Sequence, residues 1–200
     1  MSPPQQESSP ASPSSLTDVL AAVLSEAFTI IFVELIMGRL SLDANNTLAS
    51  SGAHGDPGRR RRYLGVSVRL PTPGDDGGDD EDPLVKICDY VGSFVEAAVP
   101  EMVLGCFSAD AAESPPRRRV LELTLVAPDG TTCERHVLSF ARRNPGSTPP
   151  VPDGWSAFEG PLRTLVLAAV FLAAGDGATV GPLPQEATFR LGMRVGPDLR

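Results

Sequence analysis

The segment from Leu16 to about Leu40 constrains the fold most, because it predicts a helix that is apolar around most of its circumference. Ser15 followed by Asp18 resembles a capping box at its start. One face carries apolar residues at helical spacing: Leu20, Val23, Leu24, Ala27, Phe28, Ile31 and Leu35. Other faces add Ile30, Phe32, Val33 and Ile36. Such a helix must be buried on more than one side, so we expect it at the centre of the fold.

The remaining periodic segments predict two further helices and an antiparallel sheet. In chain order they are a half-buried strand at Tyr63–Leu70, a helix from Asp82-Pro83 that Pro100 kinks or restarts, strands at Arg117–Val126 and Thr131–Phe140, a helix from Ser156 to about Gly175, and a strand at Ala187–Val195. The turn Ala127-Pro128-Asp129-Gly130 predicts that the middle two strands form a hairpin. The expected class is α+β, with three helices packed on an antiparallel sheet.

Segments rich in glycine, proline or charge set the expected domain limits. We predict a disordered leader at residues 1–14, one domain at 15–195 and a tail at 196–200. Within the domain, inserted loops are expected at residues 41–62, 71–82, 108–116 and 141–154. The net charge of −8 depends mainly on six acids between Asp75 and Asp82, without which it would be about −2. The folded body is therefore nearly neutral.

Patterns that carry catalysis are few. The sequence has no glycine-rich phosphate loop and no Gly-x-Ser-x-Gly elbow. Its two histidines are His54, in a glycine-rich loop, and His136, on a predicted strand where it shares a face with Glu134 and Leu138. Cys133 precedes His136 by three residues, so the two side chains point to opposite faces of that strand. We expect no enzymatic activity, no cofactor and no metal site.

The number of cysteines and the length of the apolar stretches indicate in which cellular compartment the protein is expected. Cys88, Cys106 and Cys133 are odd in number and widely spaced, which argues against a disulfide framework and suits a reducing compartment. Cys88 and Cys106 are expected as small core residues of the second helix. No signal peptide begins the sequence, and the apolar stretches Ala27–Val33 and Leu165–Ala174 are shorter than the ~20 residues of a membrane span. A soluble intracellular protein is the expectation.

Three runs of charged residues are candidate binding sites. The acidic run Asp75–Asp82 lacks the carboxylate spacing of a calcium loop and is expected to be solvated charge. Arg59–Arg62 and Arg117–Arg119 are short basic clusters that could contact phosphate or act as a nuclear import signal. Because no aromatic residues are interleaved with them, we expect no direct DNA binding.

The order of elements and three strings resemble the HORMA domain family, and within it the accessory subunit of translesion DNA polymerase zeta. The first is Thr29–Glu34 in the apolar helix, followed by a variable loop and the basic-tyrosine strand Arg61–Val66. The second is the strand Glu134–Phe140, similar to the family's Glu-Arg-aromatic-x-Phe strand. The third is Pro161–Leu165, similar to its Leu-Leu-Arg helix. The resemblance spans residues 16 to 195, with loop insertions.

This resemblance implies a non-catalytic nuclear adaptor in translesion synthesis and DNA repair. Family members trap an extended partner peptide under a C-terminal "safety belt", against the last core strand. The implied partners are the catalytic subunit of polymerase zeta, a Y-family scaffold polymerase and a second HORMA protomer, in a homodimer or heterodimer. Tyr90 matches a tyrosine that packs near the captured peptide, and Arg163 matches an arginine through which family members dimerise.

The sequence departs from the family in two places. Nothing after Val195 corresponds to the safety belt, and Met37-Gly38 replaces a tyrosine-proline after the first helix. Two other functions remain open at this point: a spindle-checkpoint HORMA protein in mitotic regulation, and an arginine-rich nucleic-acid-binding module. A steep loss of DNA affinity with rising salt would distinguish the latter.

Overall fold

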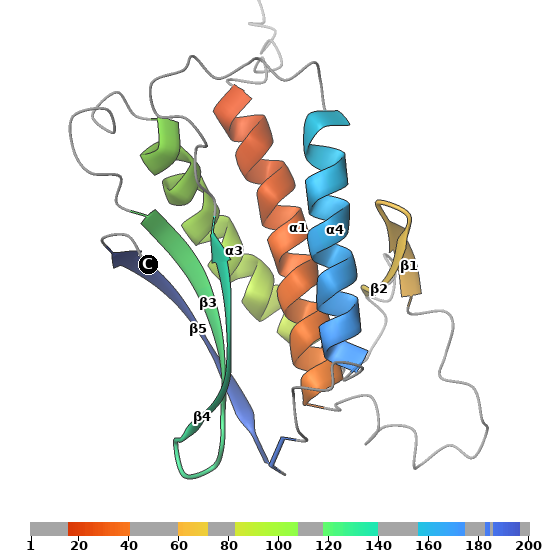
Figure 1. Ribbon diagram of the computed structural model, residues 1–200, viewed down its shortest axis with the longest axis vertical. Coiled ribbons are helices and arrows are strands. Elements are labelled where there is room, and N and C mark those ends of the chain that lie inside the picture. The colour runs from red at the N-terminus through yellow and green to blue at the C-terminus, as the bar shows by residue number, and fades with distance from the viewer. Residues whose placement is uncertain are drawn as a thin grey trace, which may run out of the picture.

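The computed structural model describes residues 16–40, 60–71, 83–107, 118–139, 156–174, 183–184 and 186–196. Its elements in chain order are α1 (Leu16–Arg39), β1 (Arg60–Tyr63), β2 (Val66–Arg69), α3 (Pro83–Phe107), β3 (Arg118–Val126), β4 (Thr132–Ser139), α4 (Ser156–Ala174) and β5 (Thr188–Gly196). They form three layers: a sheet of three strands, the three helices, and the β1–β2 hairpin on the far side of the helices (Figure 1). This is an α+β arrangement, as predicted.

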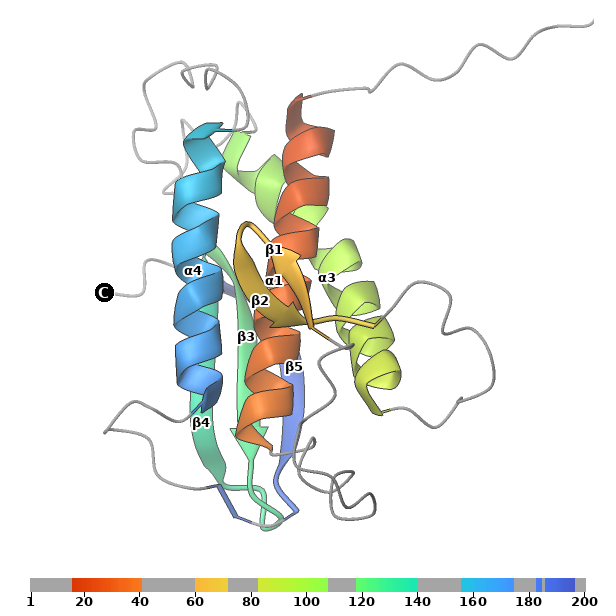
Figure 2. The ribbon, with the colours of Figure 1, turned by 90° about the vertical axis from the view of Figure 1, so that its right-hand side faces the viewer.

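Helix α1 is the central element, as its sequence predicts. It packs against α3 on one side and α4 on the other, and β2 also contacts it (Figure 2). Every residue from Ile30 to Met37 is buried. Length and composition alone would also let α1 cross a membrane, but 67% of that apolar window is buried inside the protein, as expected of a core helix.

Helices α1 and α4 approach closely where α1 ends. A Cβ atom added at Gly38 would lie 2.5 Å from Cβ of Ala173 on α4, and 2.7 Å from the Ala173 carbonyl oxygen. Real side chains do not tolerate such distances, so only glycine fits this crossing. Gly38 is therefore required by the packing of α1 against α4.

The β1–β2 hairpin corrects one prediction. Tyr63–Leu70 was expected to be a single strand, and Arg60–Arg62 were expected in a loop. Instead Arg60–Tyr63 pairs antiparallel with Val66–Arg69, and the chain reverses at Leu64-Gly65, where φ is 49° and 78°. A two-residue hairpin turn needs positive φ at such positions, and Leu64 gives no sequence signal for it. The alternation of Val66 and Val68 toward the core was correctly predicted.

The three-stranded sheet has the order β4-β3-β5, and both pairings are antiparallel. Leu121, Leu123 and Leu125 of β3 are fully buried beneath the helices. The β3–β4 register shifts between Leu125 and Val126, where β4 contributes one extra residue, Cys133. The hairpin turn at Asp129-Gly130 is as predicted, with Gly130 at a positive φ of 87°.

The two long helices that flank α1 differ in detail from prediction. Helix α3 continues through Pro100 to Phe107 as one element. On α4, Val166 and Ala169 are buried as expected. Leu165, however, was expected in the core and is 42% exposed, because α4 buries a narrower face than its apolar composition implies.

Candidate functional site

The strand β5 forms one edge of the three-stranded sheet. All nine of its residues pair with β3, and no strand among the described residues pairs with its other side. Phe189, Leu191 and Met193 turn inward onto the core, as the predicted alternation requires. Along the outer side, alternate N–H and C=O groups point away from β3. An edge of this kind can accept a further strand.

Tyr90 lies beside this edge. It projects from α3, and its ring meets the ring of Phe189 on β5 edge to face, with centroids 5.8 Å apart and planes at 67°. The side chain is 57% exposed, more than the partly buried position that helical pattern alone favours. The structure thus places Tyr90 next to β5, although the two are far apart in the sequence.

Arg163 lies on the opposite part of the helix layer. It is exposed on α4, and its guanidinium carbon is 3.9 Å from where a Cβ on Gly65 would sit, so it covers the hairpin turn. Leu165, two residues further along α4, lies about 200° around the helix from Arg163 and so points in a different direction. Arg163 and Tyr90 therefore belong to different surfaces, on α4 and α3 respectively.

An ion cluster joins α1 to the sheet. Arg39, in the last turn of α1, donates from Nε to both carboxylate oxygens of Glu134 on β4, at 2.9 and 3.1 Å. Nε2 of His136 lies 3.2 Å from Oε2 of the same carboxylate. The side chains of Arg39 and Glu134 are both at least 90% buried. His136 shares the inner face with Glu134, as predicted, and there it neighbours an Arg–Glu pair that the sequence did not reveal.

A second buried pair joins α1 to the hairpin. Glu34 is the one charged residue of the described chain with no exposure. Its carboxylate accepts a hydrogen bond from Nη1 of Arg69 at 2.8 Å, and another from the Arg69 backbone N–H. The available sequence signal was an acid within the apolar run from Ile30 to Met37. A buried carboxylate needs such partners, because its desolvation is otherwise unfavourable.

The outer face of the sheet carries a charge network across all three strands. Glu122 of β3 accepts a hydrogen bond from Arg135 of β4 at 2.7 Å and lies 3.5 Å from Arg194 of β5. Desolvation alone would raise the pKa of Glu122, but the hydrogen bond and charge of Arg135, with help from Thr124 and Arg194, hold this pKa below its usual range. The network is solvent-accessible and stabilises strand register.

The other candidate residues are dispersed. Cys88 is partly buried against the core and Cys133 is exposed, and no group of three His, Cys, Asp or Glu within the described ranges could hold a metal ion. Arg60 and Arg62 are exposed on β1, whereas Arg119 pairs with Glu101 of α3 at 3.1 Å. His54, the Cys106 side chain and the acidic run Asp75–Asp82 lie outside the described residues.

No protein-family model matches the chain, and no curated protein shows a significant sequence match to it.

Proposed function

We propose that this protein is a non-catalytic HORMA adaptor that captures an extended partner segment along the edge of β5. The observation that carries the proposal is the open edge of β5 with Tyr90 beside it. Strand addition would give affinity through main-chain hydrogen bonds, which do not depend on the partner's sequence. Selectivity would then come from side-chain contacts, and the exposed Tyr90 ring is placed to supply one.

The partner class follows from the resemblance of Thr29–Glu34, Glu134–Phe140 and Pro161–Leu165 to the accessory subunit of polymerase zeta. The captured segment would then belong to the catalytic subunit of that polymerase, with a Y-family scaffold polymerase as a further partner. The protein would act in the nucleus, in translesion synthesis and DNA repair. The element order of the fold, with a central α1 and β5 as the final strand, is compatible with this role.

Arg163 supports a second part of the proposal, which is association with another HORMA protomer. Its guanidinium is exposed beside the hairpin turn, where it could pair with a carboxylate of the other protomer. Phe171 on the same helix is 60% exposed, so α4 also offers apolar surface. Arginine and exposed aromatic residues are enriched at protein interfaces.

The test is a fluorescence-anisotropy titration with overlapping peptides that cover the catalytic subunit of polymerase zeta. We expect at least one peptide to bind, and Tyr90→Ala to weaken it by about tenfold, or ~1.4 kcal/mol. Val137→Ala is the control, since it removes an exposed apolar side chain from β4, at the opposite edge of the sheet. Binding by no peptide, or equal binding by the Tyr90→Ala protein, would refute peptide capture at this edge.

A further inference from the structure

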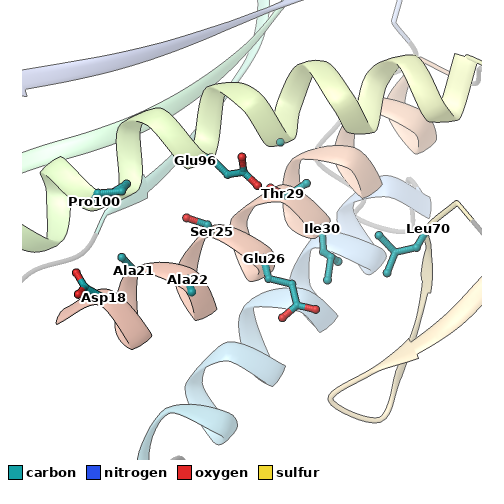
Figure 3. Close-up of a pocket in the computed structure, with 11 residues that line it drawn as sticks. Asp18, Ala21, Ala22, Ser25, Glu26, Thr29, Ile30, Leu70, Glu96 and Pro100 are labelled. Atoms are coloured by element: carbon teal, nitrogen blue, oxygen red, sulfur yellow. The ribbon is translucent and has the colours of Figure 1, made fainter. Parts of the chain in front are cut away.

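A groove of about 610 Å³ lies between α1 and α3 (Figure 3). Its walls are side chains of the two helices, and Leu70, which follows β2, lies at one end. The lining residues are Asp18, Ala21, Ala22, Ser25, Glu26, Thr29, Ile30, Leu70, Gly92, Glu96 and Pro100. The groove is distinct from the β5 edge, because none of its lining residues belongs to the three-stranded sheet.

The groove exists because one stripe of α1 is not covered. Ala22, Ser25 and Thr29 recur at helical spacing and stay at least partly exposed on a helix that is otherwise buried on most sides. Across from them on α3, Gly92 has open space where a Cβ would be. Small residues on both walls let a partner's side chains come close to the helix backbones.

The charges around the groove are all of one sign. Asp18, Glu26 and Glu96 line it, and no arginine or lysine does. In Figure 3 the Glu96 carboxylate extends from α3 toward Thr29 of α1. The field of these three carboxylates attracts cationic partners and disfavours nucleic acid.

We propose that this groove docks an amphipathic helix of a partner protein, with apolar side chains inserted between α1 and α3 and flanking lysines or arginines against Glu26 and Glu96. A helix is favoured over a strand because the lining offers side chains and no free strand edge. The α1 wall runs from Asp18 to Ile30, which at 1.5 Å per residue is about 18 Å, or three helical turns. This second surface would let the adaptor hold a helix while β5 holds an extended segment.

Substituting Gly92 separates docking from folding. A Cβ at position 92 would meet no atom within 4 Å, so Gly92→Leu adds a side chain to the groove wall, and leucine is a better helix former than glycine. Gly160→Leu is the matched control, because position 160 on α4 is equally open and is not part of the groove. Glu96→Gln removes one groove charge, and Asp129→Asn removes one charge at the β3–β4 turn as its control.

The probe is a fluorescein-labelled designed peptide of about five helical turns, with leucines at i, i+3, i+4 and i+7 and lysines elsewhere. We expect anisotropy to report binding that Gly92→Leu weakens by about tenfold or more. Glu96→Gln should weaken binding several-fold, while Gly160→Leu, Asp129→Asn and Tyr90→Ala leave it unchanged. Circular dichroism should show that the Gly92→Leu protein melts no lower than the unmodified one.

Three results would overturn the proposal. The first is no binding of the lysine peptide, or equal binding of a twin in which glutamates replace the lysines. The second is unchanged affinity of the peptide for both the Gly92→Leu and Glu96→Gln proteins, which would mean that the peptide binds only through the overall charge of the protein. The third is an equal loss in either control protein.

Discussion

The Glu34–Arg69 pair gives a prediction: removing Arg69 should lower the free energy of unfolding more than removing Glu34. Glu34 has no exposure, whereas the Arg69 side chain keeps 19%. Arg69→Met therefore leaves a fully buried carboxylate with only a backbone N–H as partner. Removing one member of a buried pair destabilises by about 3–5 kcal/mol, so we expect a loss of free energy of unfolding near that range.

The reverse substitution should be milder. Glu34→Met leaves Arg69 able to turn its guanidinium toward water, and the main loss is the acceptor for the Arg69 backbone N–H. An unsatisfied buried donor costs about 1–3 kcal/mol. The double variant Glu34→Met/Arg69→Met should then be more stable than Arg69→Met alone, because no buried charge remains.

Urea unfolding followed by circular dichroism measures all three variants. The matched control is Arg119→Met, which breaks the Arg119–Glu101 pair, whose side chains are 32% and 60% exposed. Exposed pairs contribute about 0–1 kcal/mol, so the control should differ little from the unmodified protein. If Arg69→Met costs no more than this control, or if the double variant is less stable than Arg69→Met, the reasoning from burial is wrong.

Three further predictions concern packing, ionisation and assembly. Gly38→Ala should destabilise by about 1–3 kcal/mol, because its Cβ would lie 2.5 Å from that of Ala173, and Ala173→Gly should restore part of the loss in thermal melts. Burial, with the charge of Glu26, raises the pKa of Tyr63 from 10.0 to about 12. The folded protein therefore keeps the phenol proton at a pH where the unfolded chain loses it, so the stability that the neutral Tyr63 contributes is present below pH 10 and is lost as pH rises toward 12. The tyrosinate absorbance of the unmodified protein minus that of Tyr63→Phe should accordingly titrate near 12, and a midpoint near 10 would contradict it. Arg163→Ala should change the melting temperature by only a few degrees yet convert dimer to monomer in sedimentation velocity; an unmodified protein that is already monomeric, or a dimeric variant, would exclude the dimer contact.

The helices and the β3–β4 hairpin were predictable because their signals are local. Apolar spacing over Leu16–Leu40 reports burial directly, and the Pro128-Asp129-Gly130 turn has a mechanism in its own residues. The β1–β2 hairpin was missed because its turn at Leu64-Gly65 uses a leucine with positive φ. No residue preference signals such a turn, so the alternating pattern was read as continuous.

The candidate site was less predictable, because its contacts join distant parts of the chain. Arg39 and Glu134 are 95 residues apart, and no periodicity relates them. Tyr90 and Phe189 likewise meet only because α3 lies against β5. The partner of Glu34 was not predicted either, although a carboxylate inside an apolar run requires a partner wherever it is buried. The α1–α3 groove depends on which stripe of α1 stays uncovered, and that is a property of packing.

Amide hydrogen exchange, measured with and without the proposed partner, the catalytic subunit of polymerase zeta, tests the central claim most directly. If β5 captures an extended segment, the outward N–H groups of Thr188–Gly196 gain hydrogen-bond partners, and their exchange should slow on binding. The opposite edge, Thr132–Ser139 of β4, serves as the internal control and should be unchanged. Exchange that slows in β4 but not in β5 would contradict the account. So would the absence of any complex with the catalytic subunit.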